Sequence, residues 1–123
     1  MDGAKQPFVF VIDDDEAVRE SLKIALEAHC MGIEAFGSVD EFLLHYQPRA
    51  HSCLILDHHL FGTTGLAFIQ SEECRNLHLP IILITGAGNQ RLRDAAFEAG
   101  VVGYLEKPCG VQELLAVIYA ASK

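Results

Sequence analysis

Five chemically active side chains each stand just past a run of apolar residues, although they are scattered over most of the chain. Apolar runs of this kind are typical of strands that are buried on both faces of a parallel sheet. The carboxyl ends of such strands meet at one edge of the sheet. We therefore expect the five side chains to gather at that edge, and they are Asp13, Asp14, Asp57, Thr85 and Lys107.

Three carboxylates at one edge require a cation among them. Each close pair costs about 4 kcal/mol at a separation of about 4 Å and an effective dielectric constant near 20. A hard divalent cation with oxygen ligands, Mg²⁺ or Mn²⁺, fits this donor set. A metal flanked by an ammonium group and a hydroxyl group is a site suited to a phosphoryl group.

Size and charge restrict the partners of this chain. Its 123 residues fit one domain, residues 1–123, with about 7–122 ordered. A net charge of −8, with dispersed lysines and arginines, argues against nucleic acid or an anionic membrane as a partner of this segment. The first six residues lack the apolar core of a secretory signal, and no stretch has the length of a membrane span, so we expect a cytoplasmic location.

Strand and helix patterns alternate along the chain. We expect strands at 8–12, 33–36, 53–56, 81–84 and 102–105. We expect helices at 15–29, from the capping box at 38–41 to a point before Pro48, and at 65–74, 89–99 and 111–121. Five such units with right-handed crossovers predict an α/β fold, a doubly wound parallel sheet in the order 2-1-3-4-5 with helices on both faces.

The residues at this edge resemble a known family, the receiver domains of two-component response regulators, which have a flavodoxin/CheY-like fold. The resemblance rests on four motifs in the family's order and spacing: VFVIDDDEAVRESL, CLILD ending at Asp57 with Gly65 eight residues on, IILITG around Thr85, and GYLEKP around Lys107. It covers nearly the whole chain. Within the family the chain is most similar to the FixJ-type subgroup, whose full-length members usually carry a C-terminal LuxR-like DNA-binding domain.

The resemblance implies a role for each residue near the predicted metal. Asp57 would be the phosphoacceptor, phosphorylated by a sensor histidine kinase. Asp14 would be a direct ligand of Mg²⁺, Asp13 a ligand through water, and the backbone carbonyl of His59 a further ligand. The phosphoryl group would later be lost to water, so the domain would not be a turnover enzyme.

The resemblance also implies a conformational switch. Thr85 would bond one phosphoryl oxygen, Lys107 would pair with another, and a cis peptide before Pro108 would direct this lysine into the site. Movement of Thr85 would free space for Tyr104, the aromatic switch residue. The surface formed by 89–99, 102–105 and 111–121 would then change, and it would support a homodimer or an output domain that controls transcription. The chain itself holds no output domain, and its end at Lys123 coincides with the predicted domain end.

The segment after Asp57 departs from the family pattern. Members commonly have Arg-Met-Pro here, whereas this chain has His59, Leu60 and Phe61. The missing proline leaves the loop freer, and the residue at 59 lies beside the phosphoryl site. We hypothesise that His59 alters the rate of phosphate loss.

Three other functions are compatible with parts of this pattern. An aspartyl-phosphate hydrolase of the dehalogenase type would use Asp13 and Asp15 as a nucleophile and an acid, but leaves Asp57 unexplained. A pseudo-receiver would share the fold without phosphorylation, and the altered loop keeps this alternative open. A flavodoxin-like FMN carrier would place phosphate among four acidic residues at 13–16, which would repel it.

Overall fold

A five-stranded parallel sheet forms the centre of the computed structural model, which describes residues 6–122. Two parts of the chain lie outside the described residues: Lys123, and residues 1–5, which make up most of the N-terminal segment that lacks the apolar core of a secretory signal. The order of the strands confirms the predicted 2-1-3-4-5 arrangement. From edge to edge the strands are β2 (Gly32–Phe36), β1 (Phe8–Ile12), β3 (Ser52–Asp57), β6 (Ile81–Thr85) and β7 (Gly103–Glu106).

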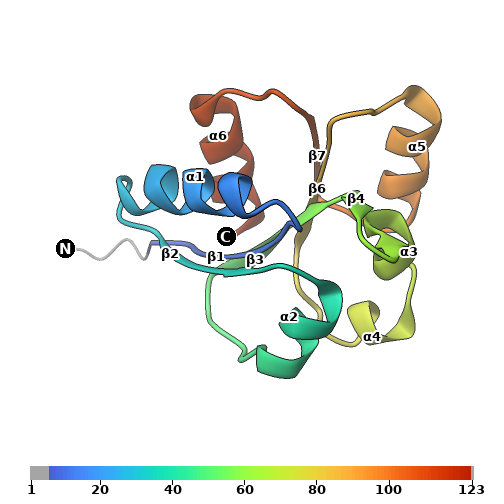
Figure 1. Ribbon diagram of the computed structural model, residues 1–123, viewed down its shortest axis with the longest axis horizontal. Coiled ribbons are helices and arrows are strands. Elements are labelled where there is room, and N and C mark those ends of the chain that lie inside the picture. The colour runs from blue at the N-terminus through green and yellow to red at the C-terminus, as the bar shows by residue number, and fades with distance from the viewer. Residues whose placement is uncertain (1–5, 123) are drawn as a thin grey trace.

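Helices cover both faces of this sheet (Figure 1). One face carries α1 (Glu16–Glu27) and α6 (Val111–Ala121). The other face carries α2 (Val39–His45), α3 (Gly65–Ile69), α4 (Glu72–Arg75) and α5 (Gln90–Glu98). In the part of the chain that is described, every helix is too short or too polar to span a bilayer.

Alternation along the strands divides the core into two layers. In β1, Val9 and Val11 pack under α1 and α6, whereas Phe10 and Ile12 pack on the opposite face. All four side chains are fully buried. This is the pattern of a central strand, because successive side chains of a strand point to opposite faces and here both faces are covered.

Aromatic rings fill the layer beneath α2. Phe42 of α2 is fully buried, and its ring centroid lies 5.9 Å from that of Phe10, 5.4 Å from that of Phe36 and 6.4 Å from that of Phe68. These rings meet edge to face, the arrangement that aromatic quadrupoles favour. Phe42 therefore ties α2 to the sheet and to α3.

The predicted cap at Ser38 is confirmed. Ser38 accepts a hydrogen bond from the backbone N–H of Glu41 at 3.1 Å, and the carboxylate of Glu41 accepts one from the N–H of Gly37 at 2.7 Å. At the end of α5, Gly100 has φ of 107°, the left-handed conformation that favours glycine after a helix. Helix starts and stops of this kind were readable because the capping contacts are local in sequence.

The expected single helix over 65–74 is wrong. The chain instead forms α3 and α4, interrupted at Ser71. The Ser71 hydroxyl donates to the carbonyl of Phe68 at 2.6 Å and accepts from the N–H of Cys74 at 3.2 Å. One side chain thus closes the first helix and caps the second, which an apolar periodicity does not reveal.

The segment expected to be a free loop forms a hairpin instead. Strands β4 (His59–Leu60) and β5 (Thr63–Thr64) pair in antiparallel fashion around Gly62, which has φ of 84°. The hairpin is followed at once by Gly65, where a Cβ atom would lie 2.7 Å from the carbonyl oxygen of Asp57. Only glycine lets α3 begin this close to the end of β3.

Candidate functional site

The strand register brings the ends of β1 and β3 to the same level. Ile12 pairs with Leu56, so Asp13, which follows β1, and Asp57, the last residue of β3, lie at the same edge of the sheet. Both aspartates are buried, with 3% and 6% of their surface exposed. Burial of two like charges side by side is unfavourable unless a cation accompanies them.

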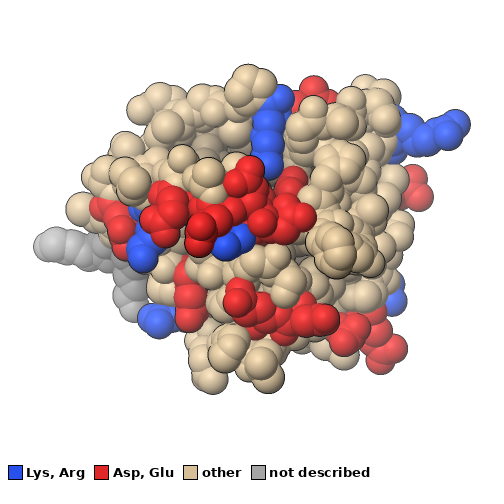
Figure 2. All heavy atoms as spheres, in the orientation of Figure 1, with Lys and Arg blue, Asp and Glu red and all other residues tan. Residues whose placement is uncertain are grey.

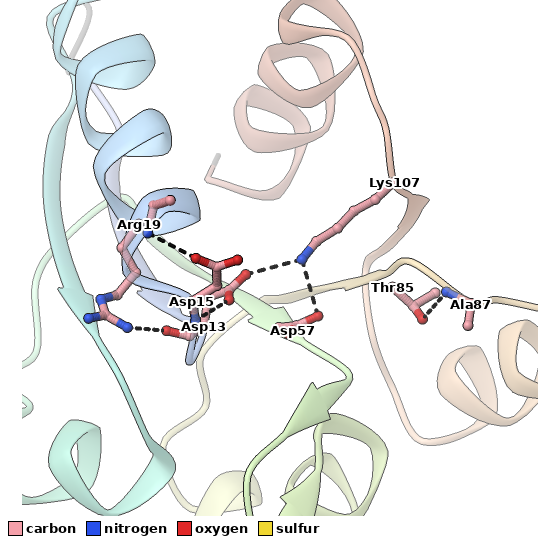
Figure 3. A network of polar contacts seen from close by, with 8 residues as sticks. Asp13, Asp15, Arg19, Asp57, Thr85, Ala87 and Lys107 are labelled. Atoms are coloured by element: carbon pink, nitrogen blue, oxygen red, sulfur yellow. Dashed lines mark hydrogen bonds and ion pairs between the residues drawn. The ribbon is translucent and has the colours of Figure 1, made fainter.

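Lys107 brings a cation between these two carboxylates (Figure 3). Its ammonium nitrogen lies 3.2 Å from Oδ2 of Asp13 and 3.4 Å from Oδ1 of Asp57. The peptide bond between Lys107 and Pro108 is cis, as expected. The side chain of Lys107 thus reaches from the end of β7 across β6 to the ends of β3 and β1.

Asp14 completes an acidic cluster at this edge. Carboxylate oxygens of Asp13, Asp14 and Asp57 all lie within 4.8 Å of one another, and Asp14 is exposed to solvent. The three negative charges exceed the single positive charge of Lys107. Their donor atoms are all oxygen, the ligand type that hard divalent cations prefer, so the cluster fits a divalent metal.

Burial and the neighbouring charges shift two pKa values in opposite senses. Burial, followed by the negative charge of Asp13, raises the pKa of Asp57, although Lys107 and the backbone of His59 act to lower it. Burial alone would lower the pKa of Lys107, but the charges of Asp13 and Asp57 outweigh burial and raise it. The ammonium is therefore held in its charged form beside a carboxylate that is difficult to ionise.

Asp13 is anchored by the turn that follows β1. Its backbone N–H donates to the carbonyl of Phe36 at 3.1 Å, and its Oδ1 accepts from the N–H of Asp15 at 2.9 Å. The side chain of Asp15 caps α1 by accepting from the N–H of Ala17 at 2.9 Å. Because Asp15 acts as a helix cap, the structure gives no support to an Asp13 and Asp15 pair of the hydrolase type.

Thr85 lies at the same edge but does not contact the charged cluster in this conformation. Its side chain is fully buried, and its hydroxyl oxygen accepts a hydrogen bond from the N–H of Ala87 at 3.1 Å. Figure 3 shows this hydroxyl near Ala87, on the far side of Asp57 from Asp13. The Thr85 hydroxyl keeps its own proton available for donation.

Tyr104 points inward. Its side chain is 8% exposed, and its hydroxyl donates to Oε2 of Glu106 at 3.2 Å. A Cβ atom at Gly88 would overlap both the Tyr104 hydroxyl and the Glu106 carboxylate. The Tyr104 ring therefore occupies space that a glycine in the loop after β6 leaves open.

His59 is exposed at the start of the hairpin, next to the buried Asp57. Its ring meets that of His58 at a centroid distance of 4.9 Å and an interplanar angle of 77°. His58 is held in turn, because its Nδ1 accepts from the N–H of Leu66 at 3.4 Å. Burial and the neighbouring His59 lower the pKa of His58, which suits its role as an acceptor.

The face around the cluster is strongly acidic. Figure 2 shows acidic side chains gathered over the N-terminal end of α1, with a second group over α2 and α4. Beside them the tip of the hairpin exposes Phe61 almost completely, at 94%. The exposed acidic residues at the start of α1 and in α2 and α4 are Asp14, Asp15, Glu16, Asp40, Glu41, Glu72 and Glu73.

A mostly apolar cavity of about 490 Å³ opens beside the cluster. It lies between α1 and α6, and Asp57 and Lys107 stand at one end of it. The cavity explains why the apolar side of α1 is only partly covered: Val18, Leu22 and Ala25 line the cavity, whereas Leu26 is fully buried.

Two residues near this site were not predicted from the sequence. Arg19 contacts the turn that holds Asp13, and Gly88 makes room for Tyr104. A signal for Arg19 was present, because a basic residue near the start of a helix opposes the helix dipole and calls for a specific partner. Gly88 carried no such signal, since a glycine in a loop has many explanations.

Comparison with known proteins gives a consistent family. The sequence model of one protein family, the response regulator receiver domain, matches residues 9–119 of this chain. Nodulation protein W of Bradyrhizobium diazoefficiens is 39% identical over 99% of this chain and 54% of that protein. The transcriptional regulatory protein FixJ of Azorhizobium caulinodans is 34% identical over 92% of this chain and 54% of that protein.

Solved structures agree with these sequence matches. The response regulator StyR superposes with a TM-score of 0.84 at 34% identity, covering 96% of this chain and 60% of that chain. The chain spans about half the length of the curated relatives that it matches.

Proposed function

Because the chain belongs to the response regulator receiver domains of two-component signalling, we propose that Asp57 is the residue that accepts the phosphoryl group. The observation that carries this assignment is the bridge of Lys107 between Asp13 and Asp57. Both oxygens of Asp13 are engaged, one by Asp15 and one by Lys107, and Asp14 is exposed. Asp57 stands at the centre of the sheet edge, where a phosphoryl group would meet all the other groups.

We propose Mg²⁺ or Mn²⁺ as the metal of this site. Asp13, Asp14, Asp57 and the backbone carbonyl of His59 would hold it, and it would supply positive charge for the phosphoryl oxygens. The excess of carboxylates over Lys107 supports this assignment, because one ammonium group cannot balance three negative charges.

In the proposed reaction a carboxylate oxygen of Asp57 attacks the phosphorus atom of the donor. A new oxygen–phosphorus bond forms while the bond from phosphorus to the donor breaks, and the donor's leaving atom keeps the electron pair. Lys107 pairs with one phosphoryl oxygen and the Thr85 hydroxyl donates to another. Water later attacks the same phosphorus, which releases phosphate and restores the Asp57 carboxylate.

A sensor histidine kinase is the proposed physiological donor. The acidic face around the cluster favours a partner whose surface is basic around its phosphorylated histidine, because complementary charges speed association. Small donors such as acetyl phosphate would reach Asp57 without such a docking surface.

The proposed output is a change on the surface of α5, β7 and α6. When Thr85 turns from Ala87 toward a phosphoryl oxygen, Tyr104 would move into the space that is freed. That surface would then support a homodimer. Control of transcription is proposed from the name of the FixJ relative, a transcriptional regulatory protein.

One experiment tests the phosphoacceptor directly. Incubation with acetyl phosphate and Mg²⁺, followed by intact mass spectrometry, should add one phosphoryl group to the native chain. Asp57→Asn should remain unmodified, whereas the control Asp40→Asn, at an exposed position in α2, should be modified like the native chain. Modification of Asp57→Asn to the native extent would refute the assignment.

A further inference from the structure

The side chain of Arg19 reaches back from α1 to the turn that carries Asp13 (Figure 3). Its Nη1 donates a hydrogen bond of 2.7 Å to the backbone carbonyl of Asp13. That carbonyl belongs to the peptide group that joins Asp13 to Asp14. The guanidinium therefore holds the peptide plane from which two of the proposed metal ligands project.

The same guanidinium connects three segments of the chain. It belongs to α1, it bonds the turn after β1, and it lies beside Gly37, where a Cβ atom would come within 3.2 Å of Nη1. The N–H of Asp13 also donates to Phe36 of β2. The turn is thus fixed on two sides, by the end of β2 and by Arg19.

Arg19 bonds a main-chain carbonyl although carboxylates stand on the same turn and helix. Arg19 lies three residues after the first residue of α1, near the positive end of the helix dipole and among exposed carboxylates. Within residues 6–122, however, its short polar contact is with a main-chain carbonyl and not with any of these carboxylates. An arginine that only neutralised the acidic face would be expected to pair with a carboxylate.

We propose that Arg19 is a positioning residue for the divalent metal site. By orienting the peptide group between Asp13 and Asp14, it keeps the oxygen atoms of both carboxylates directed at one cation. This inference rests on the proposed function, because it presupposes that the cluster binds a metal.

Two effects of Arg19 on metal affinity oppose each other. Its positive charge repels a divalent cation, but the side chain is partly exposed, so solvent and salt weaken that repulsion. Residues that orient metal ligands typically change metal affinity by roughly 10- to 100-fold. Positioning therefore outweighs repulsion, and removal of Arg19 should weaken metal binding.

Binding of Mn²⁺ alone to the whole chain tests the proposal, with electron paramagnetic resonance as the readout of free metal. Arg19→Gln removes the charge and the long fork of donors, and should weaken binding about tenfold. Arg19→Lys keeps the charge and should show a smaller loss in the same direction. Lys23→Gln, an exposed residue of the same helix, removes an equal charge and should bind as the native chain does.

The possible outcomes separate the two proposals. Native affinity or tighter binding in Arg19→Gln would overturn the positioning role, since charge repulsion alone predicts tighter binding. If circular dichroism shows that Arg19→Gln does not fold, the test passes to Arg19→Lys. Native Mn²⁺ affinity in Arg19→Lys would then overturn the positioning role. A native chain that binds no Mn²⁺ would refute the metal site itself. The losses should persist at high salt, because positioning is not screened.

Discussion

The ammonium nitrogen of Lys107 lies 3.4 Å from Oδ1 of Asp57, across 50 residues of sequence. The charge and the hydrogen bond of this lysine both lower the pKa of Asp57, while burial and Asp13 raise it. The lysine therefore opposes the rise in the pKa of Asp57 and favours its carboxylate form, which is the form that would attack phosphorus in the proposed reaction.

Replacement of Lys107 by methionine should raise the pKa of Asp57 further, because the opposing charge is removed while burial and Asp13 remain. Carbon-13 NMR titration of the Asp57 carboxyl group without divalent metal measures this change. Lys23→Met, at an exposed position of α1, should leave the titration unaltered. An unchanged Asp57 titration in Lys107→Met would contradict the role given to this ion pair.

Asp57→Asn should stabilise the fold at neutral pH without metal. The folded state raises the pKa of Asp57, so between the ordinary value near 3.9 and the raised value the folded chain binds more protons than the unfolded chain. Stability is therefore lost as pH rises through this window. Any gain appears as a higher Tm, and each 1 kcal/mol of unfolding free energy corresponds to roughly 4 °C for a domain of this size.

Thermal unfolding in chelator at pH 7 and near pH 4 measures this difference. The advantage of Asp57→Asn should shrink at the lower pH, where the native carboxyl is increasingly protonated. Asp40→Asn, in the exposed first turn of α2, should show no gain. A gain of equal size at both pH values would show that charge is not its cause.

Gly88→Ala should displace Tyr104 from its buried position. A methyl group at Gly88 would overlap the Tyr104 hydroxyl and the Glu106 carboxylate, so both must shift. Overpacking of this kind costs about 1–3 kcal/mol of unfolding free energy. Fluorine NMR of 3-fluorotyrosine would report the change at Tyr104, and urea unfolding would report the cost.

Gly86→Ala is the matched control for this substitution, because a Cβ atom there has no neighbour within 4 Å. It should leave the Tyr104 resonance in place and change stability little. Equal spectral shifts in the two variants would mean that loop stiffness, and not the space at Gly88, governs Tyr104.

Two phenylalanines should differ widely in their effect on stability. Phe42 is fully buried among other aromatic rings, so Phe42→Ala should lower the free energy of unfolding by about 3–5 kcal/mol. Phe61 is 94% exposed, so Phe61→Ala should change it by less than about 0.5 kcal/mol. Urea denaturation measures the free energy of unfolding of both variants. A large loss of stability in Phe61→Ala would mean that the Phe61 side chain packs against the rest of the chain.

His59→Arg should change the lifetime of phosphorylated Asp57. His59 is exposed, and its backbone hydrogen-bonds the Asp57 carboxylate, so a longer charged side chain there should alter how water reaches the phosphorus. The decay of labelled phosphoprotein after removal of the donor measures the lifetime. His45→Arg, at an exposed position at the end of α2, is the control, and identical decay in all three proteins would refute the hypothesis.

The shared edge of the sheet was predictable from sequence. Apolar runs report burial, and burial on both faces implies a parallel sheet whose strand ends coincide. Asp13, Asp14, Asp57 and Lys107 follow such runs, and the structure brings all four together. Thr85 reaches the same edge, although its present hydrogen bond goes to Ala87.

Tertiary structure alone decided which atoms meet. The contact of Arg19 with the carbonyl of Asp13 and the inward position of Tyr104 over Gly88 both depend on how side chains are oriented in the folded chain. Periodicity and capping motifs encode burial and contacts between near neighbours in sequence, which act over a single turn or strand. They carry no information on how two side chains from separate elements are oriented against each other. The packing of the whole core determines those orientations.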